Sequence, residues 1–492
     1  MHKLPLYRQL AAHYREAIDA GTLVPGERMP SIRTLMQRHD VSLSTALQIC
    51  RHLESEGALE ARPRAGYFVR PRALLALTPA NEPGPALPDP AQYVGVHERV
   101  SHFISSPKQV ETETNFAGAC GAPELYPAEA LRTAAMRALR QNPDLFSKTV
   151  PRTGEPQFRN VLAKRALVSR MNLAADDIIV THGCIEALNL ALRAVTQPGD
   201  TVAVESPTFF GLLQILESLG LRALEIPNSP QTGISLEALE LAAQAYGNIK
   251  AVVVVPNFQN PLCSVMPDSH KAQLVEWCEA RQIALIEDDT YAATGNGEAI
   301  PAALKAWDRT GNVIHCASLH KILAPGMRLG WMAPGKWHAR INMLKYAQSR
   351  YNDALLQLAA ADFMASSAYD RHLRRLRAHL QTQRESVAEA VATYFPQGTR
   401  LSVPEGGMAM WIELPERRSS EALFHAALHD GIRIVPGLMC SNSRRFDHFI
   451  RLSCGGLYTR EVDHALRRLG QLISALPSNA ASERSGQKPV HR

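Results

Sequence analysis

Apolar positions follow a helical period at the start of the chain and a mixed pattern after it. In residues 5–20, apolar side chains recur every four positions, which predicts an amphipathic helix that ends at Gly21. These side chains are Leu6, Leu10, Tyr14 and Ile18. From about 112 to 475, apolar runs of strand length alternate with longer helical patterns. This alternation predicts an α/β fold with a mostly parallel sheet covered on both faces. The expected strands are DIIVT, TVAVE, RALEIP, KAVVVVP, IALIEDD and VIHCAS.

Two further helices and a hairpin are expected before residue 70. Ser31 is the expected N-cap of a helix in PGERMPSIRTLMQRHD, and Ser42 caps the next helix, in SLSTALQICRHLESEG. The inward positions of this second helix are Ala46, Ile49, Cys50 and Leu53. The segment ALEARPRAGYFV then predicts a hairpin with its turn at 63–66. Two short helices followed by a hairpin are typical of a winged helix-turn-helix.

The chain divides into four stretches. At 492 residues it is too long for one hydrophobic core, since domains average about 150 residues. We expect a first domain over 1–70, a proline-rich linker over 71–110, a large domain over 111–476 and a disordered polar tail over 477–492.

Composition excludes several classes of protein. Hydrophobic residues at 46% and charged residues at 20% are ordinary for a folded chain and exclude wholesale disorder. No apolar run approaches the roughly 18 residues of a membrane helix, and the eight cysteines lack the spacing of a zinc site. We therefore expect a cytoplasmic protein with reduced thiols, without metal and without a membrane partner. The net charge of +6 permits nucleic acid as a partner without arguing for it.

Chemistry-bearing residues gather in four motifs, each beside a predicted strand. VTHGCIEALNLAL is a strand, a glycine and a helix N-terminus, whose free amides at Cys184 and Ile185 point toward an anion. PNFQNPLC places Asn260 between a strand and a turn, and IALIEDDTYA ends a buried strand in an acidic pair. SLHKILAPGMRLGW carries Ser318, His320, Lys321 and Arg328. Each motif alone is explained by a cap, a turn or a solvated charge, but their order favours one shared site.

The first 65-odd residues resemble the winged helix-turn-helix of the GntR family of bacterial regulators, through the PGERMPS-R segment and the SEG…G-FV ending. The resemblance implies DNA contacts at phosphates, at the start of the recognition helix and at the minor groove. In that order, the residues are Arg28, Ser31 and Arg33; Ser42, Ser44 and Thr45; and Arg62, Arg64 and Gly66. Many relatives carry an arginine where this chain has Leu43, so base contacts there would be apolar or absent.

Together, the four motifs resemble the fold-type I aminotransferases, which carry pyridoxal 5′-phosphate (PLP). Joined to the winged helix, they resemble the MocR subfamily of GntR regulators, with a small C-terminal α/β domain after the large one. The resemblance implies that Lys321 is the catalytic residue and forms an aldimine with PLP, and that Asp288 pairs with the pyridine nitrogen. Arg451 would grip a substrate carboxylate. The other implied cofactor contacts are Tyr291 and Asn260 at the 3′-oxygen, Ser318, His320, Arg328, Gly183, Cys184 and Ile185 at the phosphate, and Phe209 on the ring.

The chain departs from the aminotransferase pattern at several phosphate positions. Relatives commonly have Ser-Gln or Thr-Gln where this chain has Cys184-Ile185, so only backbone amides remain there. His320 replaces a frequent serine, and Thr149 stands where a tyrosine usually reaches across the dimer. The pair at 262–263, Leu-Cys, replaces Thr-Gly. These departures predict weaker PLP binding or rearranged phosphate contacts.

Two functions compete at this level. The resemblance favours a PLP-dependent transcriptional regulator that binds operator DNA and senses an amino acid, an amine or PLP itself. The alternative is an active aminotransferase with a DNA-binding appendage, because the same residues serve both. A third hypothesis, a regulator that has lost PLP, conflicts with the retention of Lys321 and Asp288. The resemblance also implies a head-to-tail homodimer, and Arg451 indicates a ligand with a carboxylate.

Overall fold

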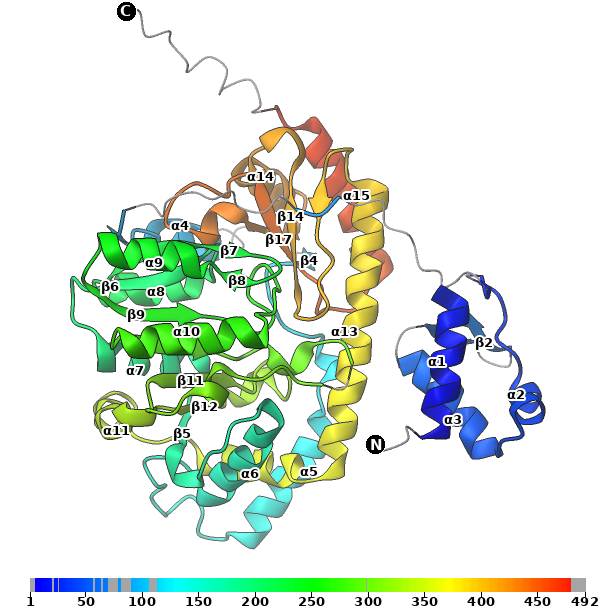
Figure 1. Cartoon of the computed structure of the whole chain (residues 1–492), viewed down its shortest axis with the longest axis horizontal. Helices are drawn as coiled ribbons and strands as arrows, with labels where there is room; N and C mark the ends of the chain where they lie inside the picture. Colours follow the sequence, from blue (N-terminus) through cyan, green and yellow to red (C-terminus); the bar gives the residue numbers. More distant parts are fainter. Residues whose placement is uncertain are drawn as a thin grey trace, which may run out of the picture.

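The computed structural model describes residues 5–19, 22–24, 26–55, 58–62, 65–69, 78–80, 90–105, 113–297 and 299–478. Figure 1 shows the N-terminal helices grouped around a small hairpin, apart from a larger body built on a sheet. Most of the tail expected over 477–492 lies outside the described residues. Within the ranges given, no helix combines the length and the apolar character needed to cross a membrane.

Three helices of the N-terminal module pack around their own core. They are α1 (Leu6–Asp19), α2 (Ile32–His39) and α3 (Leu43–Ser55). The four inward positions predicted for α3 are completely buried, and Tyr14 of α1 is buried too. Leu6 is 55% exposed, contrary to the prediction, and Ala11 is buried instead. A strict four-residue spacing drifts by about 40° per step around a helix, which carries Leu6 off the buried face.

The predicted wing is present as an antiparallel hairpin. Its strands are β1 (Leu59–Arg62) and β2 (Gly66–Val69), and Arg62 lies opposite Gly66. Gly66 has a φ of 103°, a conformation that side-chain-bearing residues rarely adopt. Residues 63 and 64 of the turn lie outside the described residues. The winged helix-turn-helix predicted from the sequence is therefore confirmed.

A nine-stranded sheet forms the centre of the large domain. Its order is β3-β7-β6-β9-β10-β11-β12-β5, with β8 paired to β7. The strands β6, β7, β9, β10 and β11 run parallel, whereas β12 and β3 run antiparallel to their neighbours. All six predicted strands are present, which confirms the α/β fold. The bounds are β3 (Gln92–Tyr93), β5 (Ile179–Thr181), β6 (Thr201–Ser206), β7 (Arg222–Ser229), β8 (Gly233–Ile234), β9 (Ile249–Val254), β10 (Ala284–Asp288), β11 (Val313–Ser318) and β12 (Gly330–Ala333).

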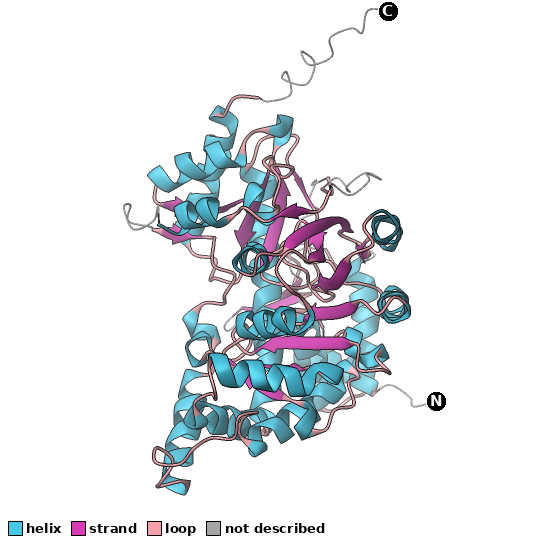
Figure 2. Cartoon of the chain, turned by 90° about the vertical axis from the view of Figure 1, so that its left-hand side faces the viewer, coloured by secondary structure: helices cyan, strands magenta, loops and turns pink. Residues whose placement is uncertain are grey.

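Helices cover both faces of this sheet, as Figure 2 shows. Side chains alternate along each strand, so on β9 Val253 packs with α7 and α8, while Val252 packs with α9 and α10. Under β5 and β12, the second face is covered by α6, α12 and the first half of α13. The bounds are α6 (Pro156–Ala166), α7 (Cys184–Val195), α8 (Phe210–Ser218), α9 (Leu236–Ala245), α10 (Asp268–Ala280), α12 (Ala354–Met364) and α13 (Ser367–Tyr394).

A hairpin at the carboxyl edge of the sheet joins β11 to β12. Ser318, at the end of β11, lies directly opposite Gly330, at the start of β12. On the other side, β12 pairs with β5, and a Cβ on Gly330 would lie 2.7 Å from the backbone of Gly183. The segment 319–329 and the start of α7 therefore meet at one corner of the sheet.

Part of the expected linker belongs to the large domain. Residues 92–93 form β3 on the edge of the sheet, and α4 (His97–Ser105) packs into its core through Val100 and Phe103. The abundance of proline in this stretch hides a short helical spacing of apolar residues. Of the linker predicted over 71–110, residues 71–77, 81–89 and 106–110 lie outside the described residues.

A smaller α/β domain completes the large body, as the resemblance implied. Its sheet has the order β13-β14-β17-β16, and β15 pairs with β4. The bounds are β4 (Thr114–Asn115), β13 (Arg400–Leu401), β14 (Ala409–Glu413), β15 (Ile432–Arg433), β16 (Val435–Pro436), β17 (Phe449–Ser453), α14 (Ser420–His429) and α15 (Arg460–Ala475). Two other helices of the large body are α5 (Ala128–Gln141) and α11 (His338–Gln348).

Candidate functional site

A cavity of about 230 Å³ opens at the corner where the carboxyl ends of the strands meet α7. Its wall brings together almost every residue that the resemblance assigned to PLP, although these residues are far apart in the chain. The predicted residues that line it are Cys184, Ile185, Phe209, Asn260, Asp288, Tyr291, Ser318, His320, Lys321, Arg328 and Arg451. Parallel strands present their ends to one edge of the sheet, which explains how motifs at successive strands converge.

Lys321 follows β11 and extends its amine into this cavity. Its Nζ donates a hydrogen bond to the Ala119 carbonyl at 2.5 Å and lies 5.7 Å from the centre of the Tyr291 ring. Tyr291 is 8% exposed, and burial raises the pKa of its phenol. A neutral phenol beside an amine provides a hydrogen-bond donor for an oxygen bound between them.

Asp288 ends β10 on the floor of the cavity. Its carboxylate accepts a hydrogen bond from the Thr290 amide and another from the thiol of Cys184, each at 3.1 Å. Burial raises the pKa of Cys184 well above its usual value, so the thiol remains a donor. The side chain of Cys184 therefore faces the carboxylate, which the sequence did not indicate.

The corner between α7 and the β11–β12 hairpin has the properties of an anion site. Gly183 caps α7 with a φ of 81°, and a Cβ there would lie 3.2 Å from Arg328 and 3.8 Å from Ser318. The first amides of α7 have no partner within the helix and carry its positive dipole. The guanidinium of Arg328 donates to the His182 carbonyl at 3.3 Å and adds a positive charge. A phosphate group fits this combination of free amides, hydroxyl and guanidinium.

His320 bridges this corner to the segment before α5. Its Nδ1 lies 3.1 Å from Arg328 Nη1, and its Nε2 lies 3.0 Å from the sulfur of Cys120. Burial, with Lys321 and Arg328 nearby, lowers the pKa of His320 to about 4. A guanidinium is only a donor, so Nδ1 accepts and the neutral ring carries its proton on Nε2.

Arg451 and Asn260 close the side of the cavity nearest the small domain. Arg451, on β17, donates to Asn260 Oδ1 at 3.2 Å and to the Ala117 carbonyl. It is only 2% exposed, and its Nε has no hydrogen-bond partner among the described residues. An unpartnered buried guanidinium nitrogen is costly and suits a carboxylate ligand.

The sequence did not point to several residues at or beside the cavity, among them Ala119, Cys120 and Thr290. Ala119 and Thr290 line the wall, and Cys120 lies 3.6 Å from Lys321 Nζ. Ala119 acts through its backbone carbonyl, which no residue pattern reveals, and Cys120 belongs to a loop without a strand pattern. Thr290 lies directly after the acidic pair, so its place after a strand end was the available signal. Thr149 is exposed and does not line the cavity.

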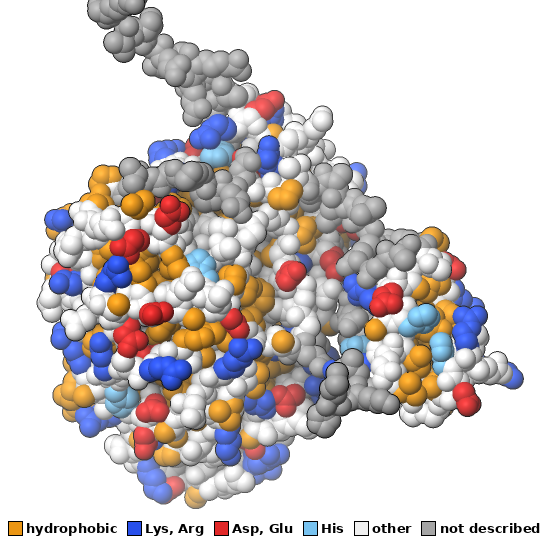
Figure 3. All heavy atoms as spheres, in the orientation of Figure 1, with side chains coloured by type: hydrophobic (Ala, Val, Ile, Leu, Met, Phe, Trp, Pro, Cys, Tyr) orange, Lys and Arg blue, Asp and Glu red, His pale blue; other side chains and the backbone are white. Residues whose placement is uncertain are grey.

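The candidate DNA contacts lie on exposed parts of α2, α3 and the wing. Ser31 caps α2 by accepting from the Thr34 amide, and the Ser42 hydroxyl accepts from the Thr45 amide at 3.3 Å. Ser42 also lies 2.8 Å from the Ser44 hydroxyl. The exposed residues in this set are Arg28, Ser31, Arg33, Ser42, Ser44, Arg62 and Gly66. Figure 3 shows Lys and Arg side chains along the outer edge of the module.

Arg62 in the wing has local partners. It donates to Glu60 at 2.7 Å, and its guanidinium lies 4.3 Å from the centre of the Phe68 ring. A Cβ on Gly66 would approach the guanidinium of Arg28 at 3.4 Å, so Arg28 lies beside the wing as well. Arg64, assigned to the minor groove from the sequence, lies outside the described residues.

Known proteins resemble both parts of the chain. The family model described as Aminotransferase class I and II matches residues 119–469, and the model described as Bacterial regulatory proteins, gntR family, matches residues 6–69. The HTH-type transcriptional regulator YdcR of Escherichia coli (strain K12), itself uncharacterized, is 36% identical over 468 residues, which cover 95% of this chain and 98% of YdcR. YjiR of the same organism, with the same description, is 34% identical over 472 residues, which cover 95% of this chain and 98% of YjiR.

A solved aminotransferase has the same fold as the large domain. It is LysN of Thermus thermophilus, an alpha-aminoadipate aminotransferase complexed with N-(5′-phosphopyridoxyl)-L-leucine. The TM-score is 0.69 at 25% identity, and the match covers 76% of this chain and 94% of LysN. The part of the chain that this match leaves out is long enough to contain the winged helix.

Proposed function

Because the chain belongs to the MocR-type regulators of the GntR family, in which a winged helix is fused to an aminotransferase class I and II domain, we propose that it senses an amino compound through PLP and regulates transcription accordingly. The observation that carries this proposal is the convergence of Lys321, Asp288 and Arg328 on one cavity of a chain that also has a winged helix. Because the proposed function requires access to DNA, we propose a cytoplasmic location.

PLP, when bound, supplies an aldehyde that reacts with amines and a ring that withdraws electrons. Lys321 Nζ would be the amine that holds the aldehyde carbon of the cofactor, and the amine of a ligand would compete with it for that carbon. Asp288 would hold a proton at the ring nitrogen, and Tyr291 and Asn260 would donate hydrogen bonds to the 3′-oxygen. Arg328, Ser318 and the first amides of α7, at Cys184 and Ile185, would hold the phosphate.

The neutral form of His320 supports this arrangement of the phosphate corner. Because Nε2 of His320 donates to Cys120, the ring orients the loop that carries Ala119 toward Lys321. Arg451 is the proposed partner of a ligand carboxylate, since its Nε lacks a partner among the described residues, and Phe209 is the proposed cover of the ring. The effector would then be an amino acid or a related amino carboxylate.

A homodimer is part of the proposal. Ile185 lines the cavity and is nevertheless 40% exposed, so the phosphate corner is open on that side within one chain. The family resemblance supports a head-to-tail partner there. Two winged helices would require a repeated or palindromic operator.

Removing the Lys321 amine tests the proposal directly. We expect the full-length protein to gain a visible absorbance band with PLP, and Lys321→Ala to lose the band completely because no other amine takes that position. The control Lys336→Ala changes a lysine that donates to Asn312, away from the cavity, and should keep the band. A band that persists in Lys321→Ala would overturn the proposed attachment.

The aminotransferase alternative is tested by turnover with an amino acid and a keto acid. Because Lys321 and Asp288 serve both functions, steady keto-acid production would favour an enzyme. The regulator hypothesis predicts instead that an amino acid changes operator affinity in the parent protein. Lys321→Ala should bind operator DNA equally well with and without that amino acid.

A further inference from the structure

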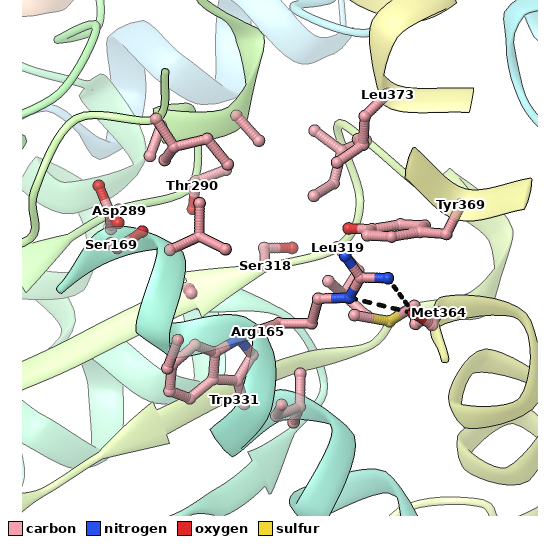
Figure 4. Close-up of a pocket in the computed structure, with 18 of the residues that line it drawn as sticks. Arg165, Ser169, Asp289, Thr290, Ser318, Leu319, Trp331, Met364, Tyr369 and Leu373 are labelled. Atoms are coloured by element: carbon pink, nitrogen blue, oxygen red, sulfur yellow. Dashed lines mark hydrogen bonds between the residues drawn. The ribbon is translucent and has the colours of Figure 1, made fainter. Parts of the chain in front are cut away.

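A second cavity, of about 360 Å³, lies beneath the sheet on the face covered by α6 and α13. Figure 4 shows it with Asp289, Ser169 and Thr290 on one side and Arg165 and Tyr369 on the other. Trp331 of β12 forms another part of the wall, and Leu373 comes from α13. Its volume is within the range of cavities that enclose small organic ligands.

Most of the wall is apolar. Leu162 of α6, Trp331 of β12 and Leu373 of α13 are each less than 10% exposed and face the cavity from three different elements. The ring of Trp331 lies 4.7 Å from that of His315, so two flat groups stand side by side in the wall. Such a wall favours a ligand with an aromatic or branched apolar body.

One end of the cavity carries buried polar groups. Nδ1 of His315 lies 2.9 Å from Glu287, whereas Nε2, on the opposite edge of the ring, has no hydrogen-bond partner among the described residues. His315 is 1% exposed. Asp289, also in the wall, accepts a hydrogen bond from Asn257 at 2.7 Å. A buried nitrogen without a partner is unfavourable unless a ligand or water supplies one.

The unpartnered Nε2 of His315, with Asp289 in the same wall, favours a ligand group that can both accept and donate a hydrogen bond. Burial alone lowers the pKa of His315, but Glu287 and Asp289 outweigh it and raise the value. Burial raises the pKa of Asp289, although the positive charge of His315 opposes it. A hydroxyl, which both accepts and donates, can satisfy the imidazole of His315 and the carboxyl of Asp289 together.

The rim of the cavity is positively charged. Arg165 is neutralised by Asp370, to which it donates at 2.5 Å. Arg374, by contrast, is exposed and lines the cavity, and within the described ranges it makes no hydrogen bond or ion pair. A carboxylate on the ligand would supply the missing partner of Arg374.

We propose that this cavity is a second ligand site, which takes a small aromatic or branched carboxylate with a hydroxyl at its far end. The two cavities share Ser318 and Thr290 as wall residues, so a ligand in the second cavity contacts the strand ends that hold the cofactor site. Neither Lys321 nor Arg451 lines the second cavity, which makes this binding separable from cofactor chemistry.

The test uses 3-(4-hydroxyphenyl)propionate, which has the three required groups and no amine, so it cannot react with PLP. Calorimetry on the full-length protein with PLP should give one site per chain. Val168 lines the rim and is 51% exposed, so Val168→Trp should weaken binding at least tenfold by covering the entrance while the fold is kept. The matched control is Leu167→Trp, at a 60% exposed neighbour that does not line the cavity, and it should change binding less than twofold.

A second pair of variants tests the charge at the rim. Arg374→Gln should weaken binding about tenfold, equal to one charge-assisted hydrogen bond, whereas Arg375→Gln, at an exposed neighbour outside the wall, should not. The ligand 3-phenylpropionate, which lacks the hydroxyl, should bind about tenfold more weakly to the parent.

Three results would overturn the proposal. The first is no binding of the probe to the parent protein, and the second is equal affinity of Val168→Trp and Leu167→Trp. The third is a loss of binding in Arg451→Gln, which would assign the probe to the cofactor cavity. None of these results bears on PLP attachment or on operator binding, so the proposed function stands or fails independently.

Discussion

The cofactor cavity and the winged helix hold their functional residues in opposite environments. In the cavity, Arg451 is 2% exposed and Asn260 is 5% exposed, and each has a defined partner. In the winged helix, Ser42, Arg33 and Arg62 are exposed, and Arg62 pairs with the neighbouring Glu60. Buried polar groups must be paired by the fold, whereas exposed ones choose among water, neighbours and a partner molecule. We therefore expect the cavity to respond to pH and the winged helix to respond to salt.

The largest effect is expected from a substitution in the core of only one of the two regions. Leu53 is completely buried in the core of the winged helix, which is distinct from the clusters of the large domain. Leu53→Ala should lower the free energy of unfolding of this module by about 2–5 kcal/mol, because it leaves a cavity. Operator binding should fall sharply while the PLP absorbance band is unchanged, as measured on the same sample.

The control for this change is Leu43→Ala. Leu43 begins the same helix but is 54% exposed, so its truncation should leave the stability of the module unchanged. If Leu53→Ala also removed the PLP band, the two regions would not be independent.

A smaller effect, on the pH dependence of stability, is expected from Glu205 on β6. Burial raises the pKa of this carboxyl to about 8, with Asp288 nearby, although Val255 and Gln259 donate hydrogen bonds to it. The folded chain then binds more protons than the unfolded chain between pH 4.5 and 8. Stability due to Glu205 is therefore present at low pH and is lost as the pH rises through this window. Glu205→Gln should remove this loss, and its free energy of unfolding should exceed that of the parent by about 1–3 kcal/mol at pH 8.

Urea unfolding of both proteins at several pH values measures this difference. Glu237→Gln, at an exposed position of α9, is the matched control and should follow the parent at every pH. Parallel pH profiles for Glu205→Gln and the parent would show that Glu205 does not titrate in this window.

The smallest effect is expected in the wing. Glu60→Gln removes the partner of Arg62 and a negative charge, so operator affinity should rise about two- to fivefold. The slope of log affinity against log salt should steepen by about one unit, because one more arginine neutralises a phosphate. Fluorescence anisotropy of labelled operator DNA measures both, and Glu16→Gln on α1 is the exposed control.

The opposite change in the wing is Arg64→Ala, which should flatten the salt slope by about one unit. Unchanged slopes in both variants would mean that the wing does not contact phosphate, and the difference drawn between the two regions would weaken.

Much of the large domain could be predicted because each strand is a continuous apolar run. The strands IALIEDD and VIHCAS were recognised from their apolar runs, and their carboxyl ends located Asp288 and Ser318 at one edge. The residues of α3 were equally clear, since Ile49 and Leu53 follow the helical period. In both places the residues that the pattern predicts to face inward are the residues that are buried.

The rest depended on contacts that periodicity does not contain. The donation from Cys184 to Asp288 joins positions more than a hundred residues apart, so only the folded chain reveals it. Arg62 was assigned to DNA by resemblance, but its pairing with Glu60 is a local choice of an exposed side chain. The packing of α4 was hidden by the prolines around it, and Leu6 was misassigned by a spacing that drifts off the helix face.

The hairpin between β11 and β12 limits how the length of the segment that joins these two strands can change. Because Ser318 and Gly330 are in register, an insertion between them must bulge outward or shift a strand by one residue. A shift by one residue would turn the side chain of Trp331 away from the second cavity and toward the opposite face of the sheet. Natural variation in the length of this loop should therefore be rare, and changes of effector should arise by substitution.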